Sequence, residues 1–353
     1  MFDRPFRTAR VRPAGAVLVS LLAALAIAAA PARADMKALV EAATKEASLT
    51  WYTAHYNAET AETIGRKFTQ LYPGIKVNVI RTTAQVAYQR LSQDIKNKTA
   101  NCDVFSSTDL GHYATLKPQG KLAKFVPENA AKLAKDYQGL DPDGTFYPTA
   151  AFLVLITYNT QKVKPEDVPK KWTDLLDPKF AGKVTVGHPA FSGAVGTWVM
   201  TMKKLYGWDY FTKLEKGKPQ IGRSIVDTVT MLNSGERAVG AGPSATTLQS
   251  MEKGNPLGVV YPEDGVVIIV SPSAVMIDAP HPNAARLFME FLLGTEHAEV
   301  DAKDGNESLR PEVKSVMKGL RPLTEVKVLR PTVEEAQKGI PEVIEQWRDT
   351  FGN

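Results

Sequence analysis

Apolar and polar positions along this chain recur in two periods, one typical of β-strands and one typical of α-helices. SLTWYT (48–53) predicts a strand, and the segment NAETAETIGRKFTQLYPG (57–74) that follows carries Ile64, Phe68 and Leu71 at helical spacing. The dipeptide Pro-Gly at the end of that segment is typical of a helix terminus. The first elements predicted by the pattern are therefore a strand and then an amphipathic helix.

The same order continues along the first half. GIKVNVI (74–80) alternates as a strand, QVAYQRLSQDIKNKT (85–99) has one apolar helical face, and CDVFSS (102–107) predicts a third strand. A β-α-β-α-β order predicts a parallel sheet with helices on both faces, and ligands of such sheets lie beyond the carboxyl ends of the strands. Three predicted loops have that position: AHYN (54–57), RTTAQ (81–85) and SSTDLGH (106–112).

The second half contains a similar α/β series between two long apolar runs. FYPTAAFLVLITYNT (146–160) predicts a central strand that leaves a first lobe, and VVYPEDGVVIIVSPSAVMI (259–277) predicts the return crossing. The helix HPNAARLFMEFLLGT (281–295) has Pro282 near its start and Gly294 at its end. Between the two runs we expect a strand in GKVTV (182–186), a loop in HPAFSGA (188–194), a strand in RAVGAG (237–242), a loop in PSATT (243–247) and a helix in LQSMEKG (248–254). Two α/β lobes joined by two crossings form a hinged clamp.

The amino terminus changes the interpretation of the charge. Four arginines precede the apolar run AGAVLVSLLAALAIAAA, which predicts a cleavable signal peptide over residues 1–34 with cleavage near Ala34–Asp35. A membrane anchor is the alternative, but the run is short and no second one of similar length follows. Residues 1–34 hold five arginines and one aspartate, so 38 basic and 37 acidic residues remain from the 43 and 38 of the whole chain. Without a concentrated basic surface we expect no nucleic-acid partner.

Size and cysteine content favour a protein held together by burial. About 319 residues follow the signal peptide, more than the roughly 250 to 300 at which single cores stop growing, which also favours two lobes. Cys102 is the single cysteine, so no internal disulfide can form, and we interpret it as a small buried thiol.

Several segments together resemble the periplasmic solute-binding proteins of bacterial ABC importers. The resemblance covers nearly all of the chain after the signal peptide, and it is closest to the type II family that includes the ferric-iron binders. It implies the type II two-lobe clamp, solute capture without a cofactor, a periplasmic location, an inner-membrane permease as partner and a monomer. The segments that carry it are WYTAHYN (51–57), GIKVNVIRTTAQ (74–85), CDVFSSTD (102–109), WTDLLDPKFAGKVTV (172–186), a Ser-Gly loop, GERAVGAG (235–242), YPEDG (261–265) and HPNAARLFMEFLLGTE (281–296).

The resemblance raises the hypothesis of a ferric-iron site, with His55, Tyr56 and Asp109 as its ligands. Fe(III) is hard and highly charged and needs several anionic oxygens at once. The iron binders carry two consecutive tyrosines after a second-lobe strand, where this chain has Gly242, Pro243 and neighbours without any tyrosine. We therefore expect no metal, with His55 and Tyr56 as a lip of the cleft, and keep iron transport as the alternative.

Hydroxyl-bearing and small residues in the predicted loops favour an anionic or polar organic solute. Several of them come just before helices, where free N–H groups and the helix dipole favour negative charge, although they can equally be ordinary helix caps. Arg81 adds a cation. Phe191 can stack on an organic ligand or belong to the core. Glu263 and Asp264 can recognise the amine of a zwitterion or form a solvated turn. The remaining predicted ligand-binding residues are Thr82, Thr83, Ser106, Ser107, Thr108, Asp109, Ser192, Gly193, Ser244 and Thr246.

A secreted enzyme is the rival class. The segment GPSAT (242–246) begins like a nucleophile elbow, but Thr246 stands where a glycine is needed, and no HExxH zinc motif occurs. SxxK at Ser315 lacks its companion motifs. We therefore predict a protein that is not an enzyme. An adhesin or a sensor-coupled receptor would share the same clamp.

These observations predict a lobe arrangement and a mechanism. The first lobe comprises residues 35–153 plus 266–318, and the second comprises 154–265 plus 319–353. A small anionic or zwitterionic solute of the phosphate, phosphonate or carboxylate type binds between them, and the closed form docks on the permease. Closure requires a solute that binds the closed form more tightly than the open form.

Overall fold

The computed structural model describes residues 36–352, so the predicted signal peptide lies outside the described residues. Its first elements alternate between helix and strand, as the periodicity predicts. They are α1 (Met36–Glu46), β1 (Ser48–Thr53), α2 (Ala58–Leu71), β2 (Lys76–Arg81), α3 (Ala84–Asn97), β3 (Val104–Ser106) and α4 (Leu110–Leu116).

The long strand β4 (Tyr147–Asn159) then leads into a second α/β series. This series comprises β5 (Val184–Gly187), α5 (Gly193–Tyr206), α6 (Asp209–Lys216), β6 (Gln220–Gly222), α7 (Ile225–Asn233), β7 (Val239–Pro243), α8 (Ser244–Glu252) and β8 (Leu257–Val260). The chain then returns through β9 (Val266–Val275). It ends with α9 (Pro282–Leu292), α10 (Thr295–Lys303), β10 (Val328–Leu329) and α11 (Val333–Phe351).

The strands form one continuous mixed sheet in the order β2-β1-β3-β9-β4-β7-β5-β6, with β10 added to β9 and β8 added to β4. The outer strands pair in parallel, β1 with β2 and β3, and β5 with β6 and β7. The central strands β4 and β9 pair antiparallel with each other. β9 also pairs antiparallel with β3, and β4 with β7. The parallel sheet expected from the sequence is thus present on each side, and the two crossing strands join both sides into a single sheet.

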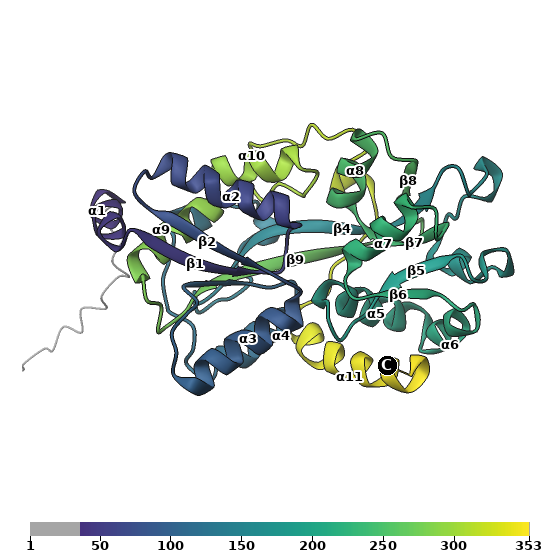
Figure 1. Ribbon diagram of the computed structural model, residues 1–353, viewed down its shortest axis with the longest axis horizontal. Helices are drawn as coiled ribbons and strands as arrows, with labels where there is room; N and C mark the ends of the chain where they lie inside the picture. The colour runs from purple at the N-terminus through teal and green to yellow at the C-terminus, as the bar shows by residue number, and fades with distance from the viewer. Residues whose placement is uncertain (1–35, 353) are drawn as a thin grey trace, which may run out of the picture. The chain divides into compact units, whose positions relative to one another are not determined.

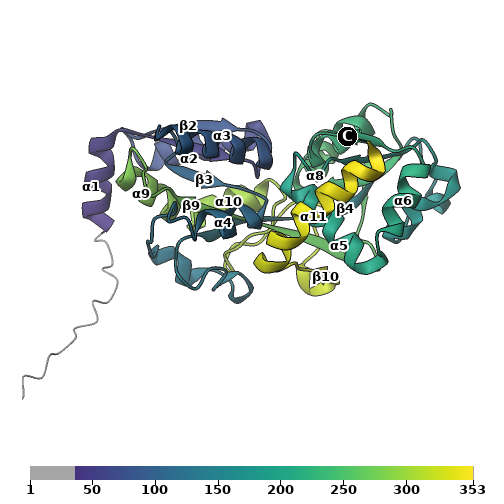
Figure 2. The same ribbon diagram turned by 90° about the horizontal axis from the view of Figure 1, so that it is seen from below.

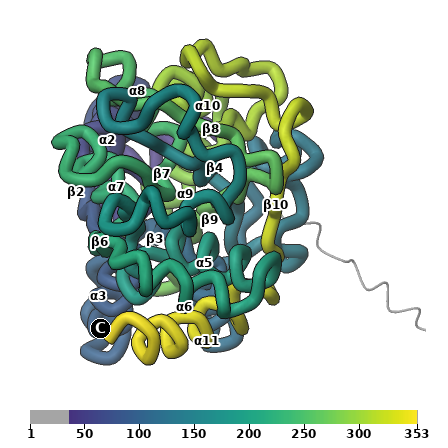
Figure 3. Tube along the Cα trace, turned by 90° about the vertical axis from the view of Figure 1, so that its right-hand side faces the viewer, coloured from purple at the N-terminus to yellow at the C-terminus, as the bar shows by residue number. Residues whose placement is uncertain are grey.

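The crossing strands separate two groups of elements. Figure 1 shows α1–α4 and α9 around β1 and β2 at one end of β4 and β9, and α5–α8 around β5–β7 at the other. We use the names first lobe and second lobe for the predicted residue sets, and their boundaries stay a prediction. The carboxyl-terminal helix α11, predicted to pack on the second lobe, packs against α5 and α6 of that lobe and also against α4 of the first (Figures 2 and 3).

Two of the predicted segments have a different structure. PSATT is not a loop, because α8 begins at Ser244 directly after β7. The apolar run 259–277 is interrupted by a turn at Pro262–Gly265 between β8 and β9. Of the apolar positions predicted for α2, Ile64 and Phe68 are fully buried, whereas Leu71 is 39% exposed.

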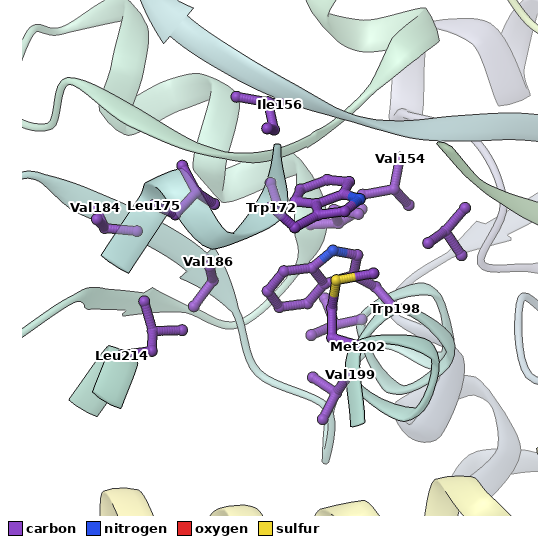
Figure 4. Close-up of a cluster of buried hydrophobic side chains, with 14 of the residues drawn as sticks. Val154, Ile156, Trp172, Leu175, Val184, Val186, Trp198, Val199, Met202 and Leu214 are labelled. Carbon is purple, nitrogen blue, oxygen red and sulfur yellow. The ribbon is translucent and has the colours of Figure 1, made fainter. Parts of the chain in front are cut away.

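Each lobe has its own apolar core. The second-lobe core contains Trp172 and Trp198, whose ring centroids lie 5.6 Å apart in an edge-on arrangement, and Val199 and Met202 from α5 (Figure 4). The indole N–H of Trp172 donates to the carbonyl of Gly265 at 2.8 Å, which joins this core to the start of β9. Among the helices of residues 36–352, none is both long and apolar enough to cross a bilayer.

Replacement of Trp198 by alanine tests this core. The side chain is 1% exposed, and removal of a buried aromatic ring leaves a cavity that costs about 3–5 kcal/mol of unfolding free energy. We expect a matching decrease in urea-unfolding free energy for Trp198→Ala, while Val316→Ala, at a position that is 83% exposed, changes it by less than about 0.5 kcal/mol. Equal unfolding midpoints for the two variants would contradict this core.

Candidate solute-binding site

A small cavity lies between the two lobes at the carboxyl ends of their strands. First-lobe residues line one side, including His55, Asn57 and Asn306, and second-lobe residues Ile225 and Thr246 line the other. The volume of about 20 Å³ has room for about one water molecule. An organic solute therefore needs the lobes to separate further than they do in this conformation.

Three helices begin at this cavity. α2 starts after Asn57, whose side chain accepts a hydrogen bond from the Thr60 N–H at 2.8 Å. α7 starts after Ser224, which forms a capping box with Asp227. α8 differs, because its N-cap residue is Pro243 and no side chain of the described part of the protein caps it. The N–H groups in the first turn of α8 therefore have no side-chain acceptor among the described residues, and a helix amino terminus favours an anion.

His55 is a titratable residue that lines the cavity. Its ring packs edge-on against Tyr56, with centroids 4.3 Å apart, and lies 5.2 Å from the ring of Phe152 on β4. Both ring nitrogens are buried and make no hydrogen bond of normal geometry with the described residues. The amide of Asn306 lies close enough to favour the charged form slightly, but burial and then the neighbouring His297 lower the pKa of His55 to about 3. The ring is neutral at physiological pH and can donate or accept one hydrogen bond.

Tyr56 lines the cavity, but its hydroxyl is bound inside the first lobe. The oxygen lies 2.9 Å from Nε2 of His297. Burial and then the Asp301 carboxylate raise the pKa of Tyr56 well above its ordinary value, which disfavours a tyrosinate. The role of Tyr56 as a lip of the cleft stays a prediction.

Arg81 is a cation that contacts this part of the first lobe. Its Nε donates to the backbone carbonyl of Tyr56 at 2.6 Å. Burial lowers the pKa of Arg81, and the carboxylate of Asp227 on α7 opposes this shift. The guanidinium therefore lies within electrostatic reach of the second lobe.

A second group of polar atoms surrounds the start of α3. Thr83 is the N-cap residue, yet its hydroxyl makes no cap hydrogen bond and is buried without a partner in residues 36–352, as is the hydroxyl of Thr53. Gln85 contacts the opposite lobe, since its N–H donates to the carbonyl of Phe191 at 3.3 Å. Its side chain donates to Asp109 at 2.8 Å. Thr82 is partly exposed beside this group.

Most of the other predicted hydroxyls are already used inside the fold. Ser106 accepts from the Trp51 indole at 2.7 Å, and Ser107 accepts from the Asp109 N–H at 3.1 Å. Ser244 accepts from the Leu153 N–H at 3.1 Å. Ser192 caps α5 through the Val195 N–H, and Thr108 is 4% exposed. These residues build the strand ends rather than offering free groups to a ligand.

Asp109 and Gly193 bring the starts of α4 and α5 together. The Asp109 carboxylate accepts from the Gly111 N–H at 2.8 Å and so caps α4. A Cβ atom at Gly193 would lie 2.6 Å from the backbone nitrogen of Asp109, so only glycine permits this contact between the lobes. Phe191 lies beside it, with the Arg223 guanidinium 4.9 Å from the ring centroid.

The acidic pair predicted to recognise an amine lies elsewhere. Glu263 is exposed and lies 3.7 Å from Lys171, and Asp264 accepts from the Trp172 N–H at 2.9 Å. Neither lines the cavity. Sequence reasoning missed Asn57, Gln85, Phe152, Gln249 and Asn306, of which the first two lie in loops that it had placed at strand ends.

Comparison with known proteins identifies the family. Residues 101–324 match the model of the family described as bacterial extracellular solute-binding protein. The chain belongs to this family. A protein of Salmonella typhimurium named as a putative 2-aminoethylphosphonate-binding periplasmic protein is 24% identical over 291 residues, 79% of this chain and 80% of the relative.

Solved structures share the fold of this solute-binding protein. The periplasmic binding protein AfuA of Actinobacillus pleuropneumoniae, with fructose-6-phosphate bound, has a TM-score of 0.78 at 23% identity and covers 86% of this chain and 98% of its own. Iron-bound HitA of Pseudomonas aeruginosa has a TM-score of 0.73 at 23% identity and covers 86% of this chain and 99% of its own. These likenesses confirm the type II two-lobe fold. The relatives whose names state a role are binding or uptake proteins rather than enzymes.

The lowered pKa of His55 predicts a specific pH dependence of stability. The folded state keeps the ring neutral down to about pH 3, whereas the unfolded chain takes up a proton near pH 6.5. The contribution of His55 to the unfolding free energy is therefore fully present above about pH 6.5, and it is lost as the pH falls toward 3. Between pH 6 and 4 we expect the unfolding free energy of the wild type to fall faster than that of His55→Gln, by up to about 1.4 kcal/mol per pH unit.

Urea titrations at several pH values measure this difference. His281→Gln is the control, because its ring is partly exposed, lies beside Asp103 at the start of α9 and does not line the cavity. Parallel pH profiles for the wild type and His55→Gln would show that the ring is solvated rather than buried at the cavity.

Proposed function

We propose that this protein is the periplasmic solute-binding component of an ABC importer and that it captures a small anionic or zwitterionic solute between its lobes. The observation that supports it is the uncapped amino terminus of α8 at a cavity that also holds the neutral, unpaired ring of His55. The signal peptide would direct it to the periplasm, where the monomer would deliver the solute to an inner-membrane permease.

The energetics require several contacts to converge. A micromolar ligand needs about 8 kcal/mol, while one helix dipole contributes about 0.3–1 kcal/mol at an exposed end. Charge-assisted hydrogen bonds contribute about 1.5–3 kcal/mol each. The proposed site therefore combines the first turn of α8 with His55, which lines the cavity from the other lobe. It adds Arg81, at the end of the neighbouring strand β2, and the unpaired hydroxyl of Thr83 just after it.

The comparisons support a phosphoryl or phosphonyl group as the anion. One relative is named for 2-aminoethylphosphonate and one structural neighbour holds fructose-6-phosphate, and both molecules carry a tetrahedral oxyanion. Recognition of an ammonium group by Glu263 and Asp264 gains no support, because both carboxylates lie away from the cavity. The anionic group is therefore the part of the solute for which the cavity offers partners, and none of the described residues that line it carries a carboxylate.

A thermal-shift panel tests the ligand class. The exported protein is mixed with phosphate, phosphonates, sugar phosphates, carboxylates, zwitterionic amines and thiamine. At least one anion should raise the melting temperature, since a ligand at 100 times its Kd stabilises the native state by about 2.7 kcal/mol. Arg81→Gln should weaken that anion about 10- to 100-fold, and Arg66→Gln, an exposed arginine of α2, should not. Stabilisation by thiamine alone would overturn the anion proposal.

Ferric iron is the alternative solute, and colour distinguishes it. A tyrosinate bound to Fe(III) gives a visible charge-transfer band. Because the Tyr56 hydroxyl is bound to His297 and burial disfavours its ionisation, chelated ferric iron should produce no such band in the wild type. A red to orange band that is lost in Tyr56→Phe would replace the anion proposal with iron transport. Retention of the band in that variant would assign the colour to another residue.

A further inference from the structure

The side chain of Gln249 forms two hydrogen bonds, and both cross from the second lobe to the first. Gln249 lies on α8, and its Oε1 accepts from Nδ2 of Asn57 at 3.2 Å. Its Nε2 donates to the backbone carbonyl of Asp304 at 2.7 Å. Asn57 precedes α2 and Asp304 follows α10, so one amide connects α8 to two separate first-lobe elements.

The surrounding hydrogen bonds fix the orientation of both amides. Asn57 must present its NH₂ to Gln249, because its Oδ1 already accepts the Thr60 N–H as the cap of α2. Gln249 must present its NH₂ to Asp304, because a carbonyl oxygen can only accept. A rotated Gln249 amide would face donor with donor on one side and acceptor with acceptor on the other.

These bonds belong to the same rigid helix as the proposed anion site. The first turn of α8 contributes Ala245 and Thr246 to the cavity, and Gln249 follows in the next turn. The loop that contains Asp304 also packs on this helix start, since a Cβ atom at Gly305 would lie 3.4 Å from Cα of Ala245. Separation of the lobes at the cavity therefore has to move α8 away from both partners of Gln249.

We propose that Gln249 is a positioning residue that holds the lobes closed over the solute. It lines the cavity, but both ends of its amide are already bound to first-lobe partners. It couples the position of α8 to that of α2 and of the loop after α10, and it thereby sets how readily the cleft opens. The inference rests on the proposed two-lobe binding function, but the closure it describes can be measured with no solute added.

The test measures the distance between the lobes in the exported protein by pulsed electron spin resonance. Spin labels are attached to cysteines introduced at the exposed residues Glu62 of α2 and Lys216 of α6. The native Cys102 is buried and should not react. With no solute present, the wild type should show a short-distance population. Gln249→Ala should reduce the ratio of short to long distances about five- to tenfold or more, as expected for the loss of two hydrogen bonds.

A second variant distinguishes loss of the Gln249 hydrogen bonds from damage to the fold. Asn57→Asp keeps an oxygen that caps α2, because aspartate is an equally good N-cap residue, but it removes the donor to Gln249. It should also open the cleft, and the double variant should open it by less than the product of the two single effects. Glu252→Ala, an exposed position on the same helix, should leave the distances unchanged. All variants should retain the wild-type circular dichroism spectrum.

The outcomes are decisive in either direction. A wild type without a short-distance population, or a Gln249→Ala variant with the wild-type distances, would overturn the role of Gln249. Failure of every anion in the thermal-shift panel would defeat the proposed ligand class, but it would leave the difference between the wild type and Gln249→Ala in place. The two proposals can therefore fail separately.

Discussion

The antiparallel pairing of β4 with β9 is the constraint on which the rest of the structure depends. Both strands are buried along most of their length and pass from one lobe to the other. They place β3 beside β9 and β7 beside β4. Because β3 and β7 are held by this common pair, the sheet brings the end of β1 with α2 and the end of β7 with α8 to opposite sides of one cavity. The arrangement of the binding site is therefore a consequence of how two apolar strands satisfy their backbone hydrogen bonds.

Most polar groups at the strand ends form hydrogen bonds within the fold, and only a few at the cavity stay available to a ligand. A buried hydroxyl without a partner is costly, so Ser106, Ser107 and Ser244 bind neighbouring backbone or indole groups. The first turn of α8 is an exception, because proline at its N-cap offers no side-chain acceptor. The ring of His55 is another, since its nitrogens find no strong partner. Groups that the fold leaves unsatisfied are the ones that a ligand can satisfy.

Two kinds of contact join the lobes: steric packing and directional hydrogen bonds. The approach of Gly193 to Asp109 is a steric requirement, which any side chain would violate. The bond from the Gln85 N–H to Phe191 and the two bonds of Gln249 are directional, and they hold only when the lobes are close. A closed cavity with room for about one water molecule implies that solute entry breaks some of these contacts. Affinity then reflects the balance between contacts with the solute and contacts between the lobes.

The sequence by itself determined the α/β order, the two crossing strands and the family, because these depend on local periodicity and on long, contiguous segments. It also placed the loops with His55 and Arg81 at strand ends. It could not show that the Tyr56 hydroxyl is bound to His297, or that Gln249 reaches both Asn57 and Asp304, since these partners are far apart in the chain. Only tertiary structure decided which polar groups are already paired. The physical reason is that hydrogen-bond satisfaction depends on distances of about 3 Å between remote residues, whereas periodicity reports only which face of an element is buried.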